Sequence, residues 1–363
     1  MVPIFVAASC RYHYQQGRSY PNRGGRYMRK HKVTSILALS LSLALLGHVA
    51  PVLPVSAAPA VPQAAAVKTN NVYNLQLGMS TAQVEQTLGK PARIDPSHTG
   101  VEWWIYNQDL NNYIQVGMQN GKVVTLFTNG AKLNLNGITI GSTTKDLQNS
   151  WGAPQNTLTI IPSLRIQKNT LTHPTYVQNN QAITFSIDQL GGNKVGGVRI
   201  STPEHFATIA IGLMYPISYS KLPELPKLTD TQIKQAALAY EKQNLDLLNV
   251  ARQRAKLPVV TWDEQVAAVA RAHSQDMAQH NFFNHTSPST GSPFDRLKQA
   301  GIRYSSAGEN IAYGQLDGIE AHMSWMNSAG HRQNLLSPKF KQLGVGIVMK
   351  DGRPYFTQNF VTR

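Results

Sequence analysis

The chain has 363 residues, of which 42% are hydrophobic and 15% are charged, a composition typical of a globular protein with room for two domains. The formal net charge is +15, but residues 1–57 contribute seven basic side chains and no acidic one, so the remainder carries 27 basic against 19 acidic groups, or +8. This moderate surplus lacks the clustered Lys/Arg face that nucleic-acid binding needs, which argues against a nucleic-acid partner. It suits attraction to an anionic cell wall or membrane surface, although solubility alone explains it equally well.

The N-terminal region has the pattern of a secretion signal. Met28–Lys32 is a basic segment, Thr34–Leu46 is apolar, and Val55-Ser56-Ala57 resembles a small-residue cleavage site. We therefore expect residues 1–57 to be a signal peptide, with Met28 as the true start, and the protein to be secreted or associated with the cell surface. An uncleaved N-terminal anchor is the alternative. The apolar run is shorter than the roughly 20 residues of a spanning helix, so we expect no transmembrane helix after cleavage.

The only cysteine, Cys10, lies in the part predicted to be removed. The mature protein would then have no disulfide and no cysteine–metal chemistry. For an exported protein, this fits a bacterium better than a disulfide-rich eukaryotic secretion.

Residues 58–70 are rich in Ala, Pro and Val and are predicted to be a linker. An internal repeat follows at a constant offset of 63 residues: Leu77–Val84 matches Ile140–Leu147, and Leu88–Pro91 matches Trp151–Pro154. Each copy has a glycine, a capping box and a short helix, and alternating apolar segments follow. We predict a domain over 71–215 made of two helix-plus-antiparallel-sheet units, 71–133 and 134–215. Its aromatic residues favour core positions over a recognition surface (Trp103, Trp104, Tyr106).

Residues 216–230 contain three prolines at Pro216, Pro223 and Pro226 and are predicted to be a second linker. Residues 231–363 then show helical periodicity followed by two strand patterns around the Asp351-Gly352 turn. The helices are expected from Asp230, after a capping box at 261–264, over 294–300 and over 319–327; the strands are expected over 343–349 and 355–361. Helices followed by an antiparallel hairpin predict an α+β layered domain.

The candidate site lies in the segment Phe282–Leu335, where His285, Glu309 and His331 stand among loop-forming residues. A structural alternative stays open. Glu309 could cap a helix at 310–312, and the two histidines could fix loop backbone. Of the other histidines, His273 is expected to pack in the core or to support the site, and His280 and His322 are expected at the surface or at helix ends. Gln358 lies in the cleft only if it faces the same side of its strand as Phe356 and Phe360, and the sequence leaves this open.

Residues 242–363 resemble the CAP superfamily, also called the SCP or pathogenesis-related-1-like domain. The motifs occur in family order: Phe283-x-His285-x-x-Pro288, Gly308-Glu309-Asn310, and Trp325 with Gly330-His331-Arg332. The resemblance implies an α–β–α sandwich with a cleft that carries two histidines and two acids. His285, His331 and Glu309 match three of these, whereas the second acid is replaced by Ser328. The repeat over 71–215 resembles the CAP-associated domain that often precedes the bacterial secreted form.

This residue set leaves three functions open. In the first, an exported, envelope-associated module binds a ligand or divalent metal through His285, Glu309, His331 and Ser328, with a cell-wall or envelope component or a protein as partner. In the second, the protein is a metal-assisted hydrolase of peptide or envelope polymer; His285 and His331 hold Zn²⁺ or another divalent metal, and Glu309 is the catalytic group. The third is lipid or sterol binding. The missing second acid favours the binding hypothesis.

Overall fold

The computed structural model describes residues 7–11, 72–167, 170–212, 216–220 and 223–363. The predicted signal peptide and first linker lie outside the described residues, apart from Ala7–Arg11.

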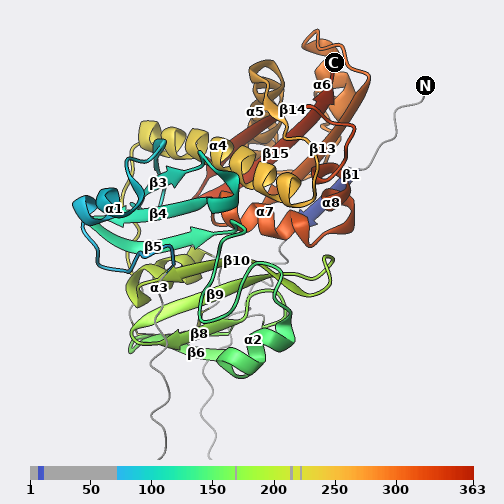
Figure 1. The fold of residues 1–363 in the computed structure, drawn as a ribbon. Coiled ribbons are helices and arrows are strands. Elements are labelled where there is room, and N and C mark those ends of the chain that lie inside the picture. The colour runs from blue at the N-terminus through green and yellow to red at the C-terminus, as the bar shows by residue number, and fades with distance from the viewer. Residues whose placement is uncertain (1–6, 12–71, 168–169, 213–215, 221–222) are drawn as a thin grey trace, which may run out of the picture. The chain divides into compact units, whose positions relative to one another are not determined.

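The repeat region forms a seven-stranded antiparallel sheet with the order β2-β3-β4-β5-β10-β9-β8 (Figure 1). The first half supplies α1 (Thr81–Leu88), β2 (Arg93–Pro96), β3 (Glu102–Tyr106), the short 3₁₀ helix η1 (Leu110–Asn112), β4 (Ile114–Gln119) and β5 (Lys122–Thr128). The second half supplies α2 (Thr144–Trp151), β8 (Thr175–Gln178), β9 (Gln181–Asp188) and β10 (Lys194–Ser201). The halves join where β5 pairs with β10. The predicted duplicated helix-plus-sheet fold is confirmed.

The two copies begin their helices in the same way. Ser80 and Thr143 are N-cap residues whose hydroxyls accept from the backbone N–H three residues later, and the side chains of Gln83 and Asp146 accept from the N-cap backbone. These reciprocal bonds satisfy N–H groups that a helix start otherwise leaves without partners. The aromatic residues of β3 are buried as expected: Trp103 is 2% exposed, and Trp104 packs in the sheet core.

A second, three-stranded sheet was not predicted. It contains β6 (Thr157–Ile161), β7 (Leu164–Gln167) and β11 (Pro216–Tyr219), and α3 (Pro203–Gly212) packs against it. The prediction of a linker beginning at Pro216 was therefore wrong over its first residues. A proline can begin a strand at a sheet edge, where its missing N–H costs no ladder hydrogen bond.

The C-terminal region is an α–β–α sandwich. Its sheet has the order β1-β13-β15-β14-β12, made of β1 (Ala7–Arg11), β12 (Thr261–Trp262), β13 (Ser306–Tyr313), β14 (Gln342–Lys350) and β15 (Arg353–Thr362). The helices are α4 (Asp230–Arg254), α5 (Glu264–His280), α6 (Pro293–Gln299), α7 (Gly318–Met326) and α8 (Ala329–Leu335). Odd residues of β13 pack with α5 and α6, whereas even residues pack with α4, α7 and α8.

Two glycines on β14 bring α5 close to the sheet. A Cβ atom added at Gly344 would lie 2.1 Å from the backbone nitrogen of Ala267, and one added at Gly346 would lie 2.0 Å from that of Arg271. Real Cβ atoms do not approach backbone this closely, so α5 rests directly on the β14 backbone. This contact fixes the helix that leads into the His285 loop.

The two domains share a core and ion pairs. Trp103 of β3 packs with Leu247 of α4 and Met323 of α7 in one apolar cluster. Buried Arg199 of β10 donates to Asp317, which caps α7, over 2.7 Å. Figure 1 shows α4 running between the strands β3–β5 and the C-terminal sheet.

Three local predictions were wrong. Thr261 and Trp262 form β12, paired with β14, so the next helix is capped by Asp263 and not by a box at 261. His322 is 1% exposed inside α7 and is not a surface residue. Helix α8 was missed because it begins within the sequence Ser328-Ala329-Gly330, which favours a loop. It starts at Ala329, and the preceding helix α7 ends at Met326.

Candidate functional site

The loop between α5 and α6 carries His285, and a buried carboxylate sets its shape. Helix α5 ends at His280, and the left-handed backbone of the next residue, Asn281 (φ 54°), turns the chain. Ser287 then donates to Asp276 of α5 over 2.5 Å and accepts from the N–H groups of Ser289 and Thr290. These bonds hold the segment after His285 against α5.

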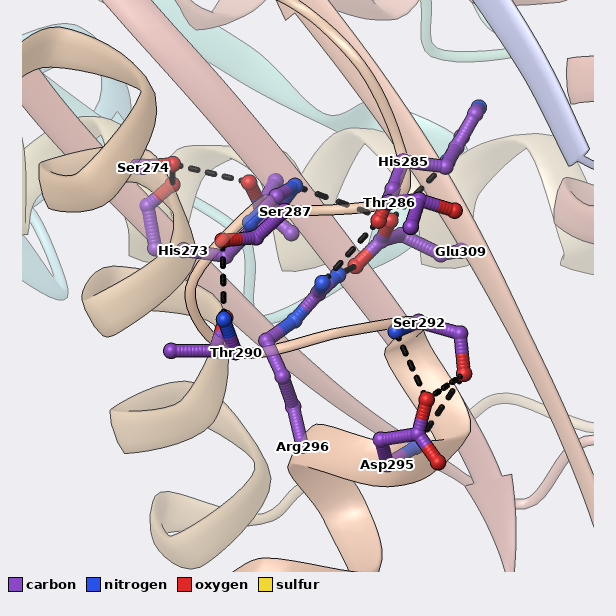
Figure 2. A network of polar contacts seen from close by, with 12 residues as sticks. His273, Ser274, His285, Thr286, Ser287, Thr290, Ser292, Asp295, Arg296 and Glu309 are labelled. Atoms are coloured by element: carbon purple, nitrogen blue, oxygen red, sulfur yellow. Dashed lines mark hydrogen bonds and ion pairs between the residues drawn. The ribbon is translucent and has the colours of Figure 1, made fainter. Parts of the chain in front are cut away.

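Glu309 is the centre of the site. Its side chain is fully buried, and both of its oxygens are occupied: Oε2 accepts from Arg296 Nη2 at 2.6 Å, and Oε1 accepts from His285 Nδ1 at 2.9 Å. Arg296 also donates to the backbone carbonyls of His285 and Gly291. Figure 2 shows the Arg296 guanidinium extending from α6 toward Glu309 and the loop. One arginine therefore fixes the carboxylate and the loop together.

The charge of Glu309 is stabilised by its neighbours. Burial raises the pKa of a carboxyl group, but the His285 hydrogen bond and the charges of Arg296, His273 and His285 together hold the pKa of Glu309 below its ordinary value. Glu309 is thus ionised at neutral pH. Because Nδ1 of His285 faces an ionised carboxylate, we assign its proton to Nδ1, which leaves Nε2 without a proton in the neutral ring.

His273, on helix α5, lies next to the Glu309 carboxylate. Its Nε2 donates to the carbonyl of Asn284 at 3.0 Å and is 4.0 Å from Glu309 Oε1. Burial lowers the pKa of His273 to about 4, with Glu309 opposing and Arg296 adding to the shift. A neutral His273 that supports the loop agrees with the packing role expected from the sequence.

His331 reaches the same strand from the other side. It is fully buried on α8, and its backbone carbonyl accepts from Asn310 Nδ2 at 3.3 Å. Because side chains alternate along β13, Asn310 faces α8 while the Glu309 carboxylate faces α5 and α6. Among the ion pairs of the described residues, none joins His331 to Glu309. The structure therefore brings His285 and Glu309 into direct contact, and it ties the backbone of His331 to Asn310, the next residue of the strand.

Ser328, the residue at the expected second acid position, begins α8. It is the N-cap residue, it is partly exposed, and its side chain makes no capping hydrogen bond. The side chain of the preceding Asn327 accepts from the N–H of Gln189 and donates to the carbonyl of Ile187, both in the repeat domain. Arg332 makes a paired contact with Asp188 of the same turn, the shorter distance being 2.6 Å. The motif around His331 thus binds the N-terminal domain.

The donors present do not fit a three-ligand hydrolytic zinc site. Both Glu309 oxygens are engaged, and no group of three or more His, Cys, Asp or Glu side chains suited to a metal occurs within the described ranges. With both oxygens engaged in this way, Glu309 is not placed to serve as a third metal ligand. Metal binding by His285 and His331 alone stays a prediction. The alternative interpretation of Glu309 as a helix cap was wrong, because 306–313 is a strand.

Sequence reasoning missed Arg296, Asn334 and Asn310. Arg296 appears in the sequence as one more charged residue on a short helix, and only its burial (5% exposed) reveals the ion pair. Asn334 donates to the Glu309 carbonyl and to Asn310 Oδ1, and so ties α8 to β13. Gln358 is fully buried and bonds to Asn310, on the face of the sheet opposite the carboxylate.

Comparison with known proteins places this geometry in a family. Residues 245–360 match the profile of the cysteine-rich secretory protein family (CAP), and residues 77–209 match the CAP-associated N-terminal domain. A Bacillus subtilis protein named "Uncharacterized membrane protein YlbC" is 35% identical over 300 residues, which cover 79% of this chain and 82% of that protein. The chain belongs to the CAP family.

Solved structures agree with this assignment. An extracellular protein containing a SCP domain from Bacillus anthracis is 30% identical, with a TM-score of 0.73; the match covers 84% of this chain and all of that one. A cysteine-rich secretory protein from Staphylococcus aureus is 21% identical, with a TM-score of 0.68 over 82% of this chain and 97% of its own, and supports the fold. Within the described part of the chain, no helix of this CAP protein has the length and apolar character needed to cross a membrane.

Proposed function

We propose that this CAP protein is an exported, cell-envelope-associated interaction protein whose cleft binds its ligand through His285. The observation that carries the proposal is the state of Glu309: it is fully buried, ionised, and bound by Arg296 and His285. A carboxylate in this position orients an imidazole and cannot itself exchange protons with a substrate. Its effect is to orient the ring and fix its tautomer, so that the imidazole of His285 can accept a hydrogen bond from a ligand N–H or O–H group or bind a cation.

The location is proposed on three grounds. The N-terminal sequence has the pattern of a signal peptide, the mature part carries +8, and the Bacillus anthracis relative is described as extracellular. The Bacillus subtilis relative is named a membrane protein, so attachment to the membrane surface is compatible with the same proposal. An anionic wall or membrane surface would attract the basic protein.

The test is co-sedimentation of residues 58–363 with purified bacterial cell-wall sacculi. These residues include the main core clusters of both domains, so we expect them to fold without residues 1–57. We expect His285→Asn to lower the bound fraction at least about fivefold. His280→Asn is the matched control, because His280 sits five residues earlier with 65% of its side chain exposed. Equal binding by wild type and His285→Asn would contradict the proposal.

A hydrolase is the second candidate, and the His285–Glu309 contact supports it too. A histidine oriented by a buried carboxylate can act as a general base on water, with Glu309 as the orienting group. Bound zinc, if present on His285 and His331, would supply Lewis-acid chemistry. Release of soluble fragments from sacculi, lost in both His285→Asn and Glu309→Gln, would establish the enzyme; the absence of release together with His285-dependent binding would leave the interaction role.

A further inference from the structure

The outer edge of β13 runs alongside this site. On its inner side β13 pairs with β15, and the pairing continues to Gly314, whose N–H donates to the carbonyl of Pro354. Backbone groups alternate between the two edges in an antiparallel pair, so even-numbered residues face β15 and odd-numbered ones face outward. Two side-chain contacts agree: the outward carbonyl of Glu309 accepts from Asn334, and that of Ile311 accepts from Trp325.

This edge accepts an extended chain in the structure itself. Strand β1 lies parallel to β13 in continuous register, from Ala7 opposite Glu309 to Arg11 opposite Tyr313, and it also contacts α8 (Figure 1). Parallel pairs use slanted bonds between a residue and the two neighbours of its partner. The outward groups of β13 therefore meet the backbone of Ala8 and Cys10, while Ala7 and Ser9 turn their N–H groups away.

A pocket of about 540 Å³ continues this edge beyond the pairing with β1. Ser306 and Ala307, the first residues of β13, line it together with Asn334, Phe340 and, from the repeat domain, Leu190. Leu190 is 50% exposed and stands two residues after Asp188, which holds Arg332 of α8. Both domains therefore form the walls of this pocket. A strand added parallel to β13 would place in it the residues that come before that strand in its own chain.

We propose that the outer edge of β13 is a peptide-binding groove. An extended segment of another polypeptide binds there as a parallel strand, and the residues before that segment enter the pocket beside Ala307. This inference rests on the proposed function, because the groove lies next to His285 and Glu309. It adds that the ligand of the site is a peptide. In the full-length chain Ala7–Arg11 hold this place. A start at Met28, or the predicted removal of residues 1–57, would leave this edge open to the partner.

Backbone hydrogen bonds supply the affinity in this mode of recognition, and the pocket selects the side chain. Leu190 and Phe340 favour an apolar residue there, and the described lining residues include Arg332 and Lys339 but no acidic side chain. A basic residue at that point of the peptide is therefore disfavoured.

The probe is a fluorescein-labelled peptide with the sequence of residues 5–13 carrying C10S, titrated with residues 58–363 by fluorescence polarisation. We expect saturable one-to-one binding. N-methylation of the peptide at positions 8 and 10 removes two hydrogen bonds and should weaken binding at least about tenfold, whereas methylation at positions 7 and 9 should change it less than about twofold. This comparison leaves the protein unaltered.

A protein variant tests the pocket. Leu190→Asp should weaken binding at least about fivefold, and Leu171→Asp, at a residue 69% exposed in the repeat domain, should not. No saturable binding, or an equal effect of both methylation patterns, would overturn the groove. The His285→Asn variant tests the proposed function separately. If this variant keeps full sacculus binding while methylation at positions 8 and 10 still weakens peptide binding more than methylation at positions 7 and 9, the groove is supported and the role of His285 is refuted.

Discussion

Arg296 offers the strongest single perturbation of the site. Its side chain is 4% exposed and that of its partner Glu309 is fully buried, and the guanidinium also satisfies two backbone carbonyls of the His285 loop. Arg296→Met would fill much of the same space but leave a buried carboxylate with one hydrogen-bonding partner. Removing one member of a buried ion pair costs about 3–5 kcal/mol. We expect the melting temperature at pH 8, followed by circular dichroism, to fall by more than about 5 °C.

The pH dependence separates this cause from a loss of packing. In the wild type the pKa of Glu309 lies below its ordinary value, so the carboxylate contributes stability that is present above the unfolded pKa and is lost as pH falls through the folded one. In Arg296→Met, burial dominates and raises the pKa of Glu309, so the variant should lose stability relative to wild type as pH rises from about 4 to 8. A pH-independent difference, or a fall no larger than that of the exposed control Arg303→Met, would refute the reasoning.

Three further predictions concern stability. Burial lowers the pKa values of His205, His273 and His322 to about 3, 4 and 3, so as pH falls these histidines take up protons in the unfolded chain before they do so in the folded one. The free energy of unfolding should therefore fall as pH drops from about 6.5 to 4. In urea denaturation measured across this pH range, His273→Gln should make the fall less steep. Gly346→Ala should lower the free energy of unfolding in urea by more than about 3 kcal/mol, because the added Cβ meets the α5 backbone. Gly196→Ala is the control and should cost far less, since the nearest atom to a Cβ added there is 3.5 Å away. Equal losses would contradict the close contact. A double-mutant cycle on Asp188→Ala and Arg332→Ala should give a coupling of about 1 kcal/mol, and a value of zero would show that this pair does not join the domains.

The fold followed from the sequence wherever local chemistry and periodicity agreed. The repeat predicted the same capping box at Ser80 and Thr143, and the structure has both. Alternating apolar segments were predicted after the first capping box, and β3, β4 and β5 form there, with β4 and β5 joined at the Asn120-Gly121 turn; β2 was not predicted. By contrast, β6 and β7 were missed, since a short strand pair in a small separate sheet has only a weak pattern.

The site was only partly predictable. His285 and Glu309 were found from their motifs and are in contact. Their partner Arg296 lies on helix α6, outside both motifs, and only the folded chain brings it to them. The burial of His331 has a consequence for mutagenesis. A histidine on a cleft wall could be truncated to alanine with little effect on the thermal transition, whereas a fully buried one leaves a cavity. His331→Gln is therefore a better probe of this position than His331→Ala.

The claim that Glu309 orients His285 can be measured directly by long-range ¹H–¹⁵N NMR of the imidazole rings in residues 58–363 at pH 7.5, with His285→Asn to assign the signal. Our account predicts that the neutral His285 ring carries its proton on Nδ1 and leaves Nε2 unprotonated, and that Glu309→Gln shifts the tautomer equilibrium. A His285 ring with its proton on Nε2, or one whose two tautomers interconvert equally in wild type and Glu309→Gln, would contradict it.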